Sequence, residues 1–423
     1  MKRIVIFGPG PQFKGGIANY TSSLAKALDK EGAEVHIVSW TQMYPSIFPR
    51  DLIDRSSKSN LLEKTKIYVH YITNYNNPFT WKRTVKIIND LKPDIVVVQW
   101  SVSIQGLPIG YITKRLRAVC NAEIIFDLHV VKQKETSLID GLMLRYALSK
   151  PQTYIVHSLK TFEELKSVFP GIKYKLIDNE RRAKLSSIQQ VIKLYHPVYD
   201  MFTPDPNFDK EKQKSELGLH KHVFLFFGFI RKYKGLHNVI NSFAKLAKER
   251  NDVSLLIVGE SFWETLDPKK ISTKIKQKVF GVIKKILVKK SDDETNYKPL
   301  ELIEKHGIDD KVVVVNRYVG NEEVHKYFQL ADCNVLFYLV ATPSGVESIA
   351  YNFKLPSIAT KVGHFPETII DGYNGYLAEP ENIESMYETM KRFIDKPIPP
   401  ENVEEKSKQM SWENYAKSIL NYS

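Results

Sequence analysis

The sequence predicts an α/β protein made of two doubly wound domains, and three observations support this prediction. The chain has 423 residues, which is too long for one ordinary core and suits two domains of about 200 residues each. Short β-branched segments alternate with segments of helical periodicity, as in the βαβ units that build a parallel sheet. This alternation restarts after a polar, proline-containing segment at residues 203–207. We therefore expect one domain over residues 1–202 and a second over residues 203–423.

The first half of the chain contains seven candidate strands. They are Arg3–Phe7, Glu34–Ser39, Lys66–His70, Asp94–Gln99, Glu123–Leu128, Thr153–His157 and Val191–Leu194. Between the first two strands, apolar residues recur at helical spacing from Ile17 to Leu28, and Gly32 suits the C-terminal end of that helix. The first domain is therefore expected to be a Rossmann-like parallel sheet covered by helices.

The second half repeats this organisation with five candidate strands. They are His222–Phe227, Val253–Val258, Lys311–Val315, Asn334–Tyr338 and Ser357–Ala359. A helix between the first two places Leu236, Val239 and Phe243 on one face. In doubly wound domains, ligands bind at the C-terminal ends of the strands. We therefore expect the two domains to present their sites to a central cleft, and the final helix at 411–421 to pack back on the N-terminal domain.

The composition indicates a globular protein with anionic partners. Hydrophobic residues make up 43% of the chain, and Lys and Arg exceed Asp and Glu by 13. No stacking platform or known reading motif accompanies the basic residues, so we expect no nucleic-acid partner. Two distant cysteines, Cys120 and Cys333, exclude a disulfide framework and favour a reducing compartment. No apolar stretch approaches the ~18 residues of a membrane span, so we expect a cytoplasmic protein.

One basic segment, residues 267–292, interrupts the alternation and is interpreted as an insertion. Nine lysines lie between Lys269 and Lys290, and apolar residues recur among them at helical spacing. This pattern predicts a basic amphipathic helix. Its apolar stripe either packs on its own domain or enters an anionic membrane surface, which would make the protein peripheral at the inner face of the membrane.

The segment from Phe227 to Gly235 is the strongest candidate for a phosphate site, because it follows an apolar strand and opens a helix. Gly228 permits close approach of the backbone, and Arg231 and Lys234 lie three residues apart. The N-terminus of the following helix adds partial positive charge. The alternative is a solvated basic turn.

Two further turns are candidates for anion contacts. Ser344, Gly345 and Val346 lie between a strand and a helix, where unpaired N–H groups of the first helical turn point outward. The alternative is a simple helix cap by Ser344. Gly15 and Gly16 follow the first strand, but their spacing is not G-x-G-x-x-G, so no nicotinamide or flavin site is predicted.

His129 directly follows the strand Glu123–Leu128, at the edge of the sheet where ligands bind. Such an imidazole can bond a substrate hydroxyl or share a proton, and the alternative is a structural histidine. The chain contains no H-E-x-x-H motif, no P-loop and no G-x-S-x-G motif, which disfavours hydrolase and kinase functions. We predict no metal and no cofactor.

Taken together and in this order, these residues resemble the retaining glycosyltransferases of family four, which have the GT-B fold. The most specific parts are Gly228–Gly235, Ser357–Glu367 and Asp371–Leu377. The resemblance implies hexosyl transfer from a nucleotide-sugar donor, bound mainly by the second domain, to a polysaccharide or lipid-linked glycan acceptor held by the first.

The resemblance also implies roles for single residues. Arg231 and Lys234 would neutralise the leaving diphosphate while the Gly15–Gly16 loop approaches it. His129 would lie near the donor sugar, and Arg317 and Tyr318 near the nucleobase.

One departure from the family pattern concerns two glutamates eight residues apart. Counting back from Pro356 puts Ala341 and Ile349 at those positions. Glu347 is the nearest acid, and the alternative is that the Ser344–Val346 turn holds the donor instead. The missing glutamates leave a catalytically silent GT-B scaffold as one alternative. A sugar-nucleotide epimerase is another alternative within the same fold.

Overall fold

The computed structural model describes residues 1–45, 53, 61–131, 138–149, 153–177, 188–261, 297–343 and 345–421. The predicted insertion at 267–292, with its basic helix, lies outside these residues. Over the described residues the chain divides into an N-terminal unit, residues 1–197 with 411–421, and a C-terminal unit, residues 198–261 with 297–410. The boundary predicted at residue 203 lies a few residues inside the C-terminal unit.

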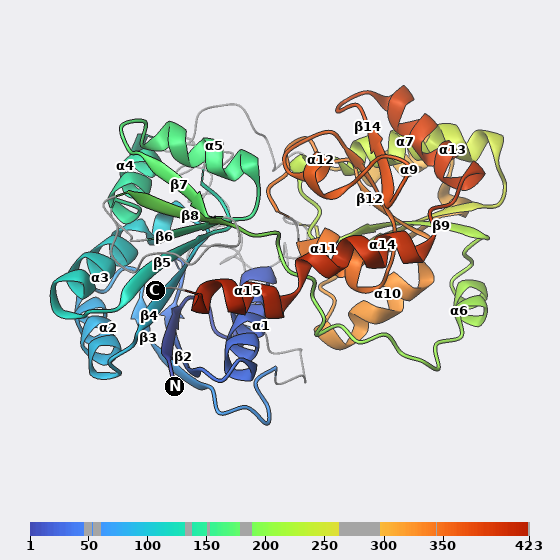
Figure 1. Cartoon of the computed structure of the whole chain (residues 1–423). Helices are drawn as coiled ribbons and strands as arrows, with labels where there is room; N and C mark the ends of the chain where they lie inside the picture. Colours follow the sequence, from blue (N-terminus) through green and yellow to red (C-terminus); the bar gives the residue numbers. More distant parts are fainter. Residues whose placement is uncertain are drawn as a thin grey trace, which may run out of the picture. The chain divides into compact units, whose positions relative to one another are not determined.

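The N-terminal unit is built on a parallel sheet of eight strands, in the order β3-β2-β1-β4-β5-β6-β8-β7 (Figure 1). The strands are β1 (Arg3–Phe7), β2 (Glu34–Gln42), β3 (Tyr68–Asn74), β4 (Ile95–Trp100), β5 (Glu123–Leu128), β6 (Thr153–Val156), β7 (Tyr174–Ile177) and β8 (Gln189–Lys193). The strand order reverses between β1 and β4, which creates a switch point at the C-terminal ends of these two strands.

Helices cover both faces of this sheet. They are α1 (Gly16–Lys30), α2 (Pro78–Asp90), the 3₁₀ turn η1 (Ser103–Gln105), α3 (Gly106–Val119), α4 (Leu138–Ala147), α5 (Leu159–Val168) and α15 (Trp412–Leu420). Right-handed crossovers place α1 on one face and α2, α3 and α4 on the other, because the chain moves across the sheet in opposite directions. Accordingly, α15 packs on α1, whereas α3 packs between α2 and α4.

The C-terminal unit has a parallel sheet of six strands, in the order β11-β10-β9-β12-β13-β14. The strands are β9 (His222–Phe227), β10 (Val253–Val258), β11 (Val312–Val315), β12 (Cys333–Leu336), β13 (Ser357–Thr360) and β14 (Gly375–Ala378). The helices are α6 (Lys210–Glu216), α7 (Leu236–Glu249), α9 (Glu301–His306), α10 (Val324–Leu330), α11 (Gly345–Asn352), α12 (Phe365–Thr368), α13 (Ile383–Asp395) and α14 (Pro400–Ser407), with 3₁₀ turns η2 (Lys232–Lys234), η4 (Asp309–Lys311), η5 (Asn321–Glu323) and η6 (Lys408–Met410).

The central strands of both sheets are fully buried, because helices cover both of their faces. The run Ile95–Val98 and the run Leu255–Val258 are apolar at every position, as this environment requires. The predicted α/β fold with two doubly wound domains is confirmed. In the described part of the chain, no helix is both long enough and apolar enough to cross a bilayer.

Candidate functional site

The switch point of the C-terminal unit lies between β9 and β12, and the predicted phosphate segments follow these two strands. A Cβ placed on Gly228 would lie 3.5 Å from a methyl group of Val346. The turn after β9 and the start of α11 therefore meet at this point. Helix α11 begins at Gly345, as predicted, while Ser344 lies outside the described residues.

Two features of the structure require glycine at residue 228, its backbone conformation and the closeness of Lys234. Its φ of 95° lies in the region that favours glycine, and an added Cβ would lie 2.6 Å from Nζ of Lys234. The ammonium group of Lys234 therefore lies directly over the Gly228 backbone. A side chain at residue 228 would displace this cation.

Lys234 is a buried cation, with only 7% of its surface exposed. Its Nζ donates to the carbonyl of Phe227 at 3.4 Å and lies 5.7 Å from the ring centre of Tyr338. Burial, with a smaller contribution from Arg231, lowers the pKa of Lys234 to about 7. No carboxylate among the described residues pairs with it. A buried cation without a protein counter-ion indicates an anionic ligand.

Arg231 directly precedes η2, and its guanidinium lies 5.6 Å from the ring centre of Tyr233. The short turn η2 brings Arg231 and Lys234 to the same end of β9. Gly235, with φ 66°, is the N-cap of α7, and a Cβ at this position would lie 2.0 Å from the carbonyl oxygen of Phe337. Two cations and a helix N-terminus thus lie together at the switch point.

Arg317 and Tyr318 follow β11, as predicted, but the guanidinium of Arg317 already has protein partners. It forms an ion pair with Glu323, with Nη1 2.9 Å from Oε1, and Nη1 also donates to the carbonyl of Tyr318 at 3.2 Å. Both charged side chains are partly exposed. A base bound here would share Arg317 with Glu323, a partner that the sequence did not indicate.

Glu347 points into the protein and is 3% exposed. Its Oε2 accepts a hydrogen bond from Nε2 of His364 at 2.5 Å, and its Oε1 accepts one from the hydroxyl of Thr368 at 2.5 Å. Ala341 and Ile349 are also buried. Glu347 therefore ties α11 to α12, a contact that sequence reasoning missed because the partners lie 17 and 21 residues away.

In the N-terminal unit, the glycine loop follows β1 at the switch point. Gly15 has φ 108°, caps α1 without a side-chain hydrogen bond, and an added Cβ would have no atom within 4 Å. Gly16 is the first residue of α1. The loop therefore leads into the N-terminus of α1, whose partial positive charge attracts anions.

His129 follows β5 and belongs to a buried hydrogen-bond network. Its Nε2 lies 2.5 Å from Oε1 of Gln99, and Nε2 of Gln99 donates to Oδ2 of Asp127 at 3.2 Å. The other oxygen of Asp127 lies 2.8 Å from Nε2 of His157. These polar residues lie at the C-terminal ends of the adjacent strands β4, β5 and β6, a positional signal that was available in the sequence.

This network determines which nitrogen of His129 carries hydrogen. The Asp127 carboxylate can only accept, so the amide group of Gln99 faces it and the Gln99 oxygen faces His129. Nε2 of His129 must therefore donate. Burial lowers the pKa of His129 to about 4. The imidazole is thus neutral near pH 7, and Nδ1 is an acceptor with no hydrogen-bond partner among the described residues.

Aromatic side chains close this cluster. The Tyr20 ring meets His129 edge-on at 4.6 Å between ring centres, and it contacts Trp412 at 4.9 Å and Tyr415 at 6.0 Å. Trp412 and Tyr415 belong to α15, so this helix shields the hydrogen bond between Asp127 and His157. Burial alone would raise the pKa of Asp127, but the charge and hydrogen bond of His157 lower it to about 2.

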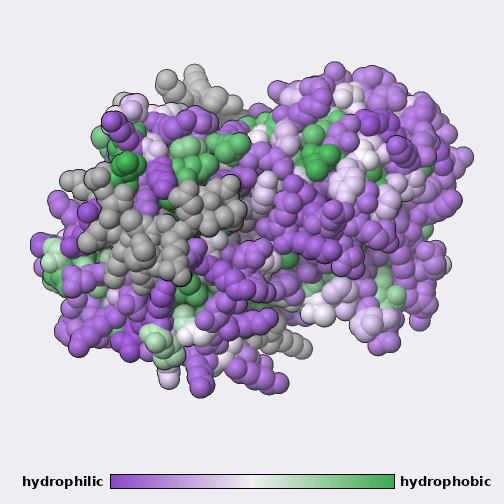
Figure 2. Space-filling view, in the orientation of Figure 1, coloured by the Kyte–Doolittle hydropathy of each residue, from purple (hydrophilic) through white to green (hydrophobic). Residues whose placement is uncertain are grey.

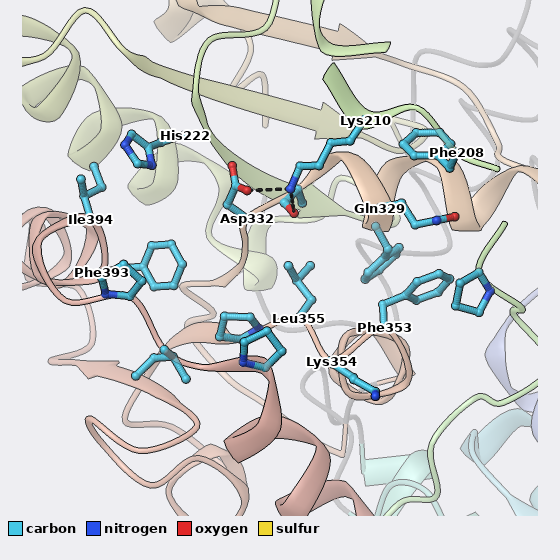
Figure 3. Close-up of a pocket in the computed structure, with 17 residues that line it drawn as sticks. Phe208, Lys210, His222, Gln329, Asp332, Phe353, Lys354, Leu355, Phe393 and Ile394 are labelled. Atoms are coloured by element: carbon cyan, nitrogen blue, oxygen red, sulfur yellow. Dashed lines mark hydrogen bonds and ion pairs between the residues drawn. The ribbon is translucent and has the colours of Figure 1, made fainter. Parts of the chain in front are cut away.

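A cavity of about 660 Å³ in the C-terminal unit lies elsewhere, near the N-terminal ends of β9, β12 and β13 (Figure 3). Its walls are largely phenylalanine and proline, and Lys210 lies 2.7 Å from Asp332. Asp332 also accepts hydrogen bonds from Lys214 and from the backbone of Val223. The other polar residues of its lining, His222, Gln329 and Lys354, also have protein partners, so the cavity offers no evident chemistry.

Known proteins resemble this chain in sequence and in fold. Residues 207–410 match the family model of glycosyl transferases group 1. Spore coat protein SA of Bacillus subtilis is 27% identical over 188 residues, which are 44% of this chain and 42% of that protein. The aligned region thus spans less than half the length of this curated relative.

Two solved structures share the fold over nearly the whole chain. HepE of Anabaena, in complex with UDP and glucose, is 14% identical with a TM-score of 0.67. Sucrose-phosphate synthase from Thermosynechococcus elongatus is 16% identical with a TM-score of 0.64. Each alignment covers 99% of this chain and 98% of the other. The chain therefore has the GT-B fold, and its C-terminal unit matches the family model of glycosyl transferases group 1.

Proposed function

We propose that this protein is a retaining glycosyltransferase of family four that moves a hexosyl group from a nucleotide-sugar donor to a polysaccharide or lipid-linked glycan. The observation that carries the proposal is the buried amino group of Lys234, which lies over Gly228 at the switch point and has no carboxylate partner among the described residues. This arrangement suits a diphosphate, whose negative charge would pair with the ammonium group of Lys234.

In the proposed reaction, the bond between the sugar and the diphosphate breaks, and negative charge grows on the leaving oxygen. Lys234 and Arg231 stabilise this charge, and the N–H groups at the start of α11, from Gly345 and Val346, add hydrogen-bond donors. The Ser344–Val346 turn takes the place of the missing glutamates. The proposal includes no metal, because the two cations supply the neutralisation.

His129 is proposed to contact the donor sugar as a neutral acceptor. Its Nδ1 accepts a hydrogen bond from a sugar hydroxyl, while Nε2 remains bonded to Gln99. Gly15 and Gly16 are proposed to approach the diphosphate, and Arg317 and Tyr318 the base. Because HepE was solved with UDP and with UDP-glucose, a UDP-sugar is the first donor to test.

The location proposed for the protein is the cytoplasm, with peripheral contact at the inner membrane face through the basic segment at 269–290, for which the sequence predicts a helix. The acceptor would then be reached at the membrane surface.

Donor hydrolysis and sugar transfer test the proposal directly. Arg231→Ala and Lys234→Ala should each lower kcat/KM by roughly 100-fold or more, because each removes a cation from the leaving group. Full activity of the double variant would refute the site. A wild-type protein that neither binds nor cleaves any nucleotide sugar would be a scaffold, and interconversion of the donor sugar would indicate an epimerase.

A further inference from the structure

Two lysines are buried in the part of the chain that the structure describes, and their surroundings differ. Lys214 is 5% exposed and Lys234 7%, whereas the surface of the C-terminal unit, to which both belong, is largely hydrophilic (Figure 2). Nζ of Lys214 donates to the carbonyl of Lys221 at 2.7 Å and lies 3.3 Å from Oδ2 of Asp332. A carboxylate therefore balances the charge of Lys214, as is usual for a buried ion.

Lys234 has no comparable set of partners. An ammonium group has three N–H donors, and the one hydrogen-bond acceptor of Lys234 among the described residues is the carbonyl of Phe227. The distance to this carbonyl is 3.4 Å, which exceeds the usual length of a hydrogen bond. The ring of Tyr338, with its centre 5.7 Å from Nζ, adds a weak attraction. The charged form of Lys234 is therefore poorly stabilised in the ligand-free protein.

The charged side chains on the elements around Lys234 do not supply the missing negative charge. Arg231, which precedes η2, is itself positive and disfavours a second positive charge nearby. Glu347 of α11 is bonded to α12, and neither Glu347 nor Glu260, which follows β10, pairs with Lys234. Because burial and Arg231 lower the pKa of Lys234 to about 7, the amine is mostly neutral above that pH.

A bound diphosphate would reverse this preference. Its negative charges would lie beside Nζ of Lys234 and would favour the ammonium form by direct attraction. This attraction is strong in a site that is shielded from water. By linkage, the diphosphate and the proton each raise the affinity of the protein for the other.

We propose that the donor site binds a proton together with its nucleotide sugar, and that Lys234 is the group that takes this proton from the solvent. The inference rests on the proposed function and deepens it, because it makes donor affinity depend on pH. Well above pH 7 the donor meets a neutral amine, so binding includes the uptake of one proton. Below pH 7 the proton is already present, so affinity is highest there and falls as pH rises.

Calorimetric titration of the full-length protein with UDP-glucose tests the proposal. Both phosphates of this probe are esterified, so neither has the second ionisation near pH 6 that a terminal phosphate has. Titrations in two buffers of different ionisation enthalpy count the protons that are taken up. We expect about 0.1 proton at pH 6 and about one at pH 8.5, with an affinity roughly 30-fold weaker at pH 8.5.

Two variants assign the proton to one lysine. Lys214→Met is the matched control, because it removes the other buried lysine of the same unit with the same change in side chain and net charge. This variant should keep both the proton uptake and the pH dependence of affinity. Lys234→Arg carries a cation that does not lose its proton in this range. It should bind UDP-glucose with uptake near zero and with equal affinity at pH 6 and pH 8.5.

A measurement on the wild type covers the case in which arginine does not fit beside Gly228. Protein labelled with ¹³C at lysine Cε should show one NMR resonance that is absent from Lys234→Met. This resonance should titrate near pH 7 in the ligand-free protein and well above pH 7 with UDP-glucose bound.

Three outcomes would overturn the inference and leave the proposed function intact. They are UDP-glucose binding at pH 8.5 without proton uptake, uptake that is lost equally in Lys214→Met, and a Lys234 resonance that titrates near its ordinary value of 10.5 in the ligand-free protein. A protein whose Lys234 titrates near pH 7 but that binds no nucleotide sugar would instead refute the proposed function, and the coupling with it.

Discussion

At the scale of single residues, the buried Lys234 lowers the stability of the folded protein and is proposed to bind the donor diphosphate. In the folded protein its pKa is lowered to about 7, from the ordinary value of 10.5. The unfolded chain therefore binds more protons than the folded chain between these values, and stability should rise with pH across that range. Below pH 7 Lys234 is charged in both states, so the whole free-energy cost of burying its charge lowers the stability of the folded protein.

Replacement of Lys234 by methionine should therefore stabilise the protein while abolishing donor binding. The gain in unfolding free energy should reach roughly 5 kcal/mol below pH 7 and shrink towards pH 10.5, because a change of one in a pKa corresponds to about 1.4 kcal/mol. Chemical denaturation at several pH values measures the gain, and calorimetric titration with UDP measures the loss. A variant less stable than wild type at pH 6 would contradict the account of a buried, unpaired cation.

The Gln99 side chain acts on His129 by fixing its tautomer and orientation. Gln99→Leu should lower sugar transfer by roughly 10-fold to 100-fold, with UDP affinity nearly unchanged, since the nucleotide is proposed to bind the C-terminal unit. His129→Ala should behave in the same way. Steady-state kinetics with UDP titration distinguish these effects. If UDP affinity fell as far as turnover, His129 would have a structural role.

Replacement of Glu347 should lower folding stability while leaving donor affinity nearly unchanged. Glu347→Gln replaces an acceptor oxygen with a donor that opposes either His364 or Thr368, which should cost about 1 to 3 kcal/mol of folding stability. Donor affinity should change little, because both oxygens already have protein partners. Urea denaturation and UDP titration supply the two measurements. A stable variant with weak donor binding would reassign the carboxylate to the ligand.

At the scale of elements, α15 completes a core that begins with the first helix of the chain. Trp412 and Tyr415 cover Tyr20, and Lys2 donates to the carbonyl of Leu420 at 2.5 Å. Trp412→Ala should therefore destabilise the N-terminal unit by about 3 to 5 kcal/mol. Near-ultraviolet circular dichroism with thermal melting tests this. An exposed helix would instead give a loss below about 0.5 kcal/mol.

Most strands could be predicted because fully buried parallel strands are apolar at every position. β1, β5, β9 and β10 have the predicted bounds. β7 and β14 were missed because each is an edge strand of four residues. Tyr174–Ile177 is partly exposed and contains Lys175, and Gly375–Ala378 begins with glycine, so neither has the apolar run of a central strand.

The candidate site was predictable where it depends on local sequence. Gly228, Arg231, Lys234 and Gly345 lie within short turns, so their spacing alone brings them to the ends of β9 and β12. The partners of His129 and Glu347 were not found, because Gln99 and His364 approach them through pairing of strands and packing of helices far apart in sequence. Register and packing determine such contacts.

At the scale of the whole molecule, the two units carry different parts of the proposed chemistry. Each has its own parallel sheet and its own buried core. The cations for a diphosphate belong to the C-terminal unit, while His129 and its network belong to the N-terminal unit. A ligand held by one unit should therefore stabilise that unit selectively, since it binds only the folded state.

Differential scanning calorimetry with UDP is the corresponding test. We expect two unfolding transitions, of which UDP raises mainly that of the C-terminal unit, because this unit supplies the proposed cations and base contacts while the N-terminal unit supplies only the Gly15–Gly16 loop. At a UDP concentration 100-fold above Kd the stabilisation is about 2.7 kcal/mol, which for a unit of about 200 residues corresponds to roughly 5 to 10 °C. The Arg231→Ala and Lys234→Ala double variant should lose this shift, whereas His129→Ala should keep it. A shift that survives in the double variant would move the nucleotide site away from β9.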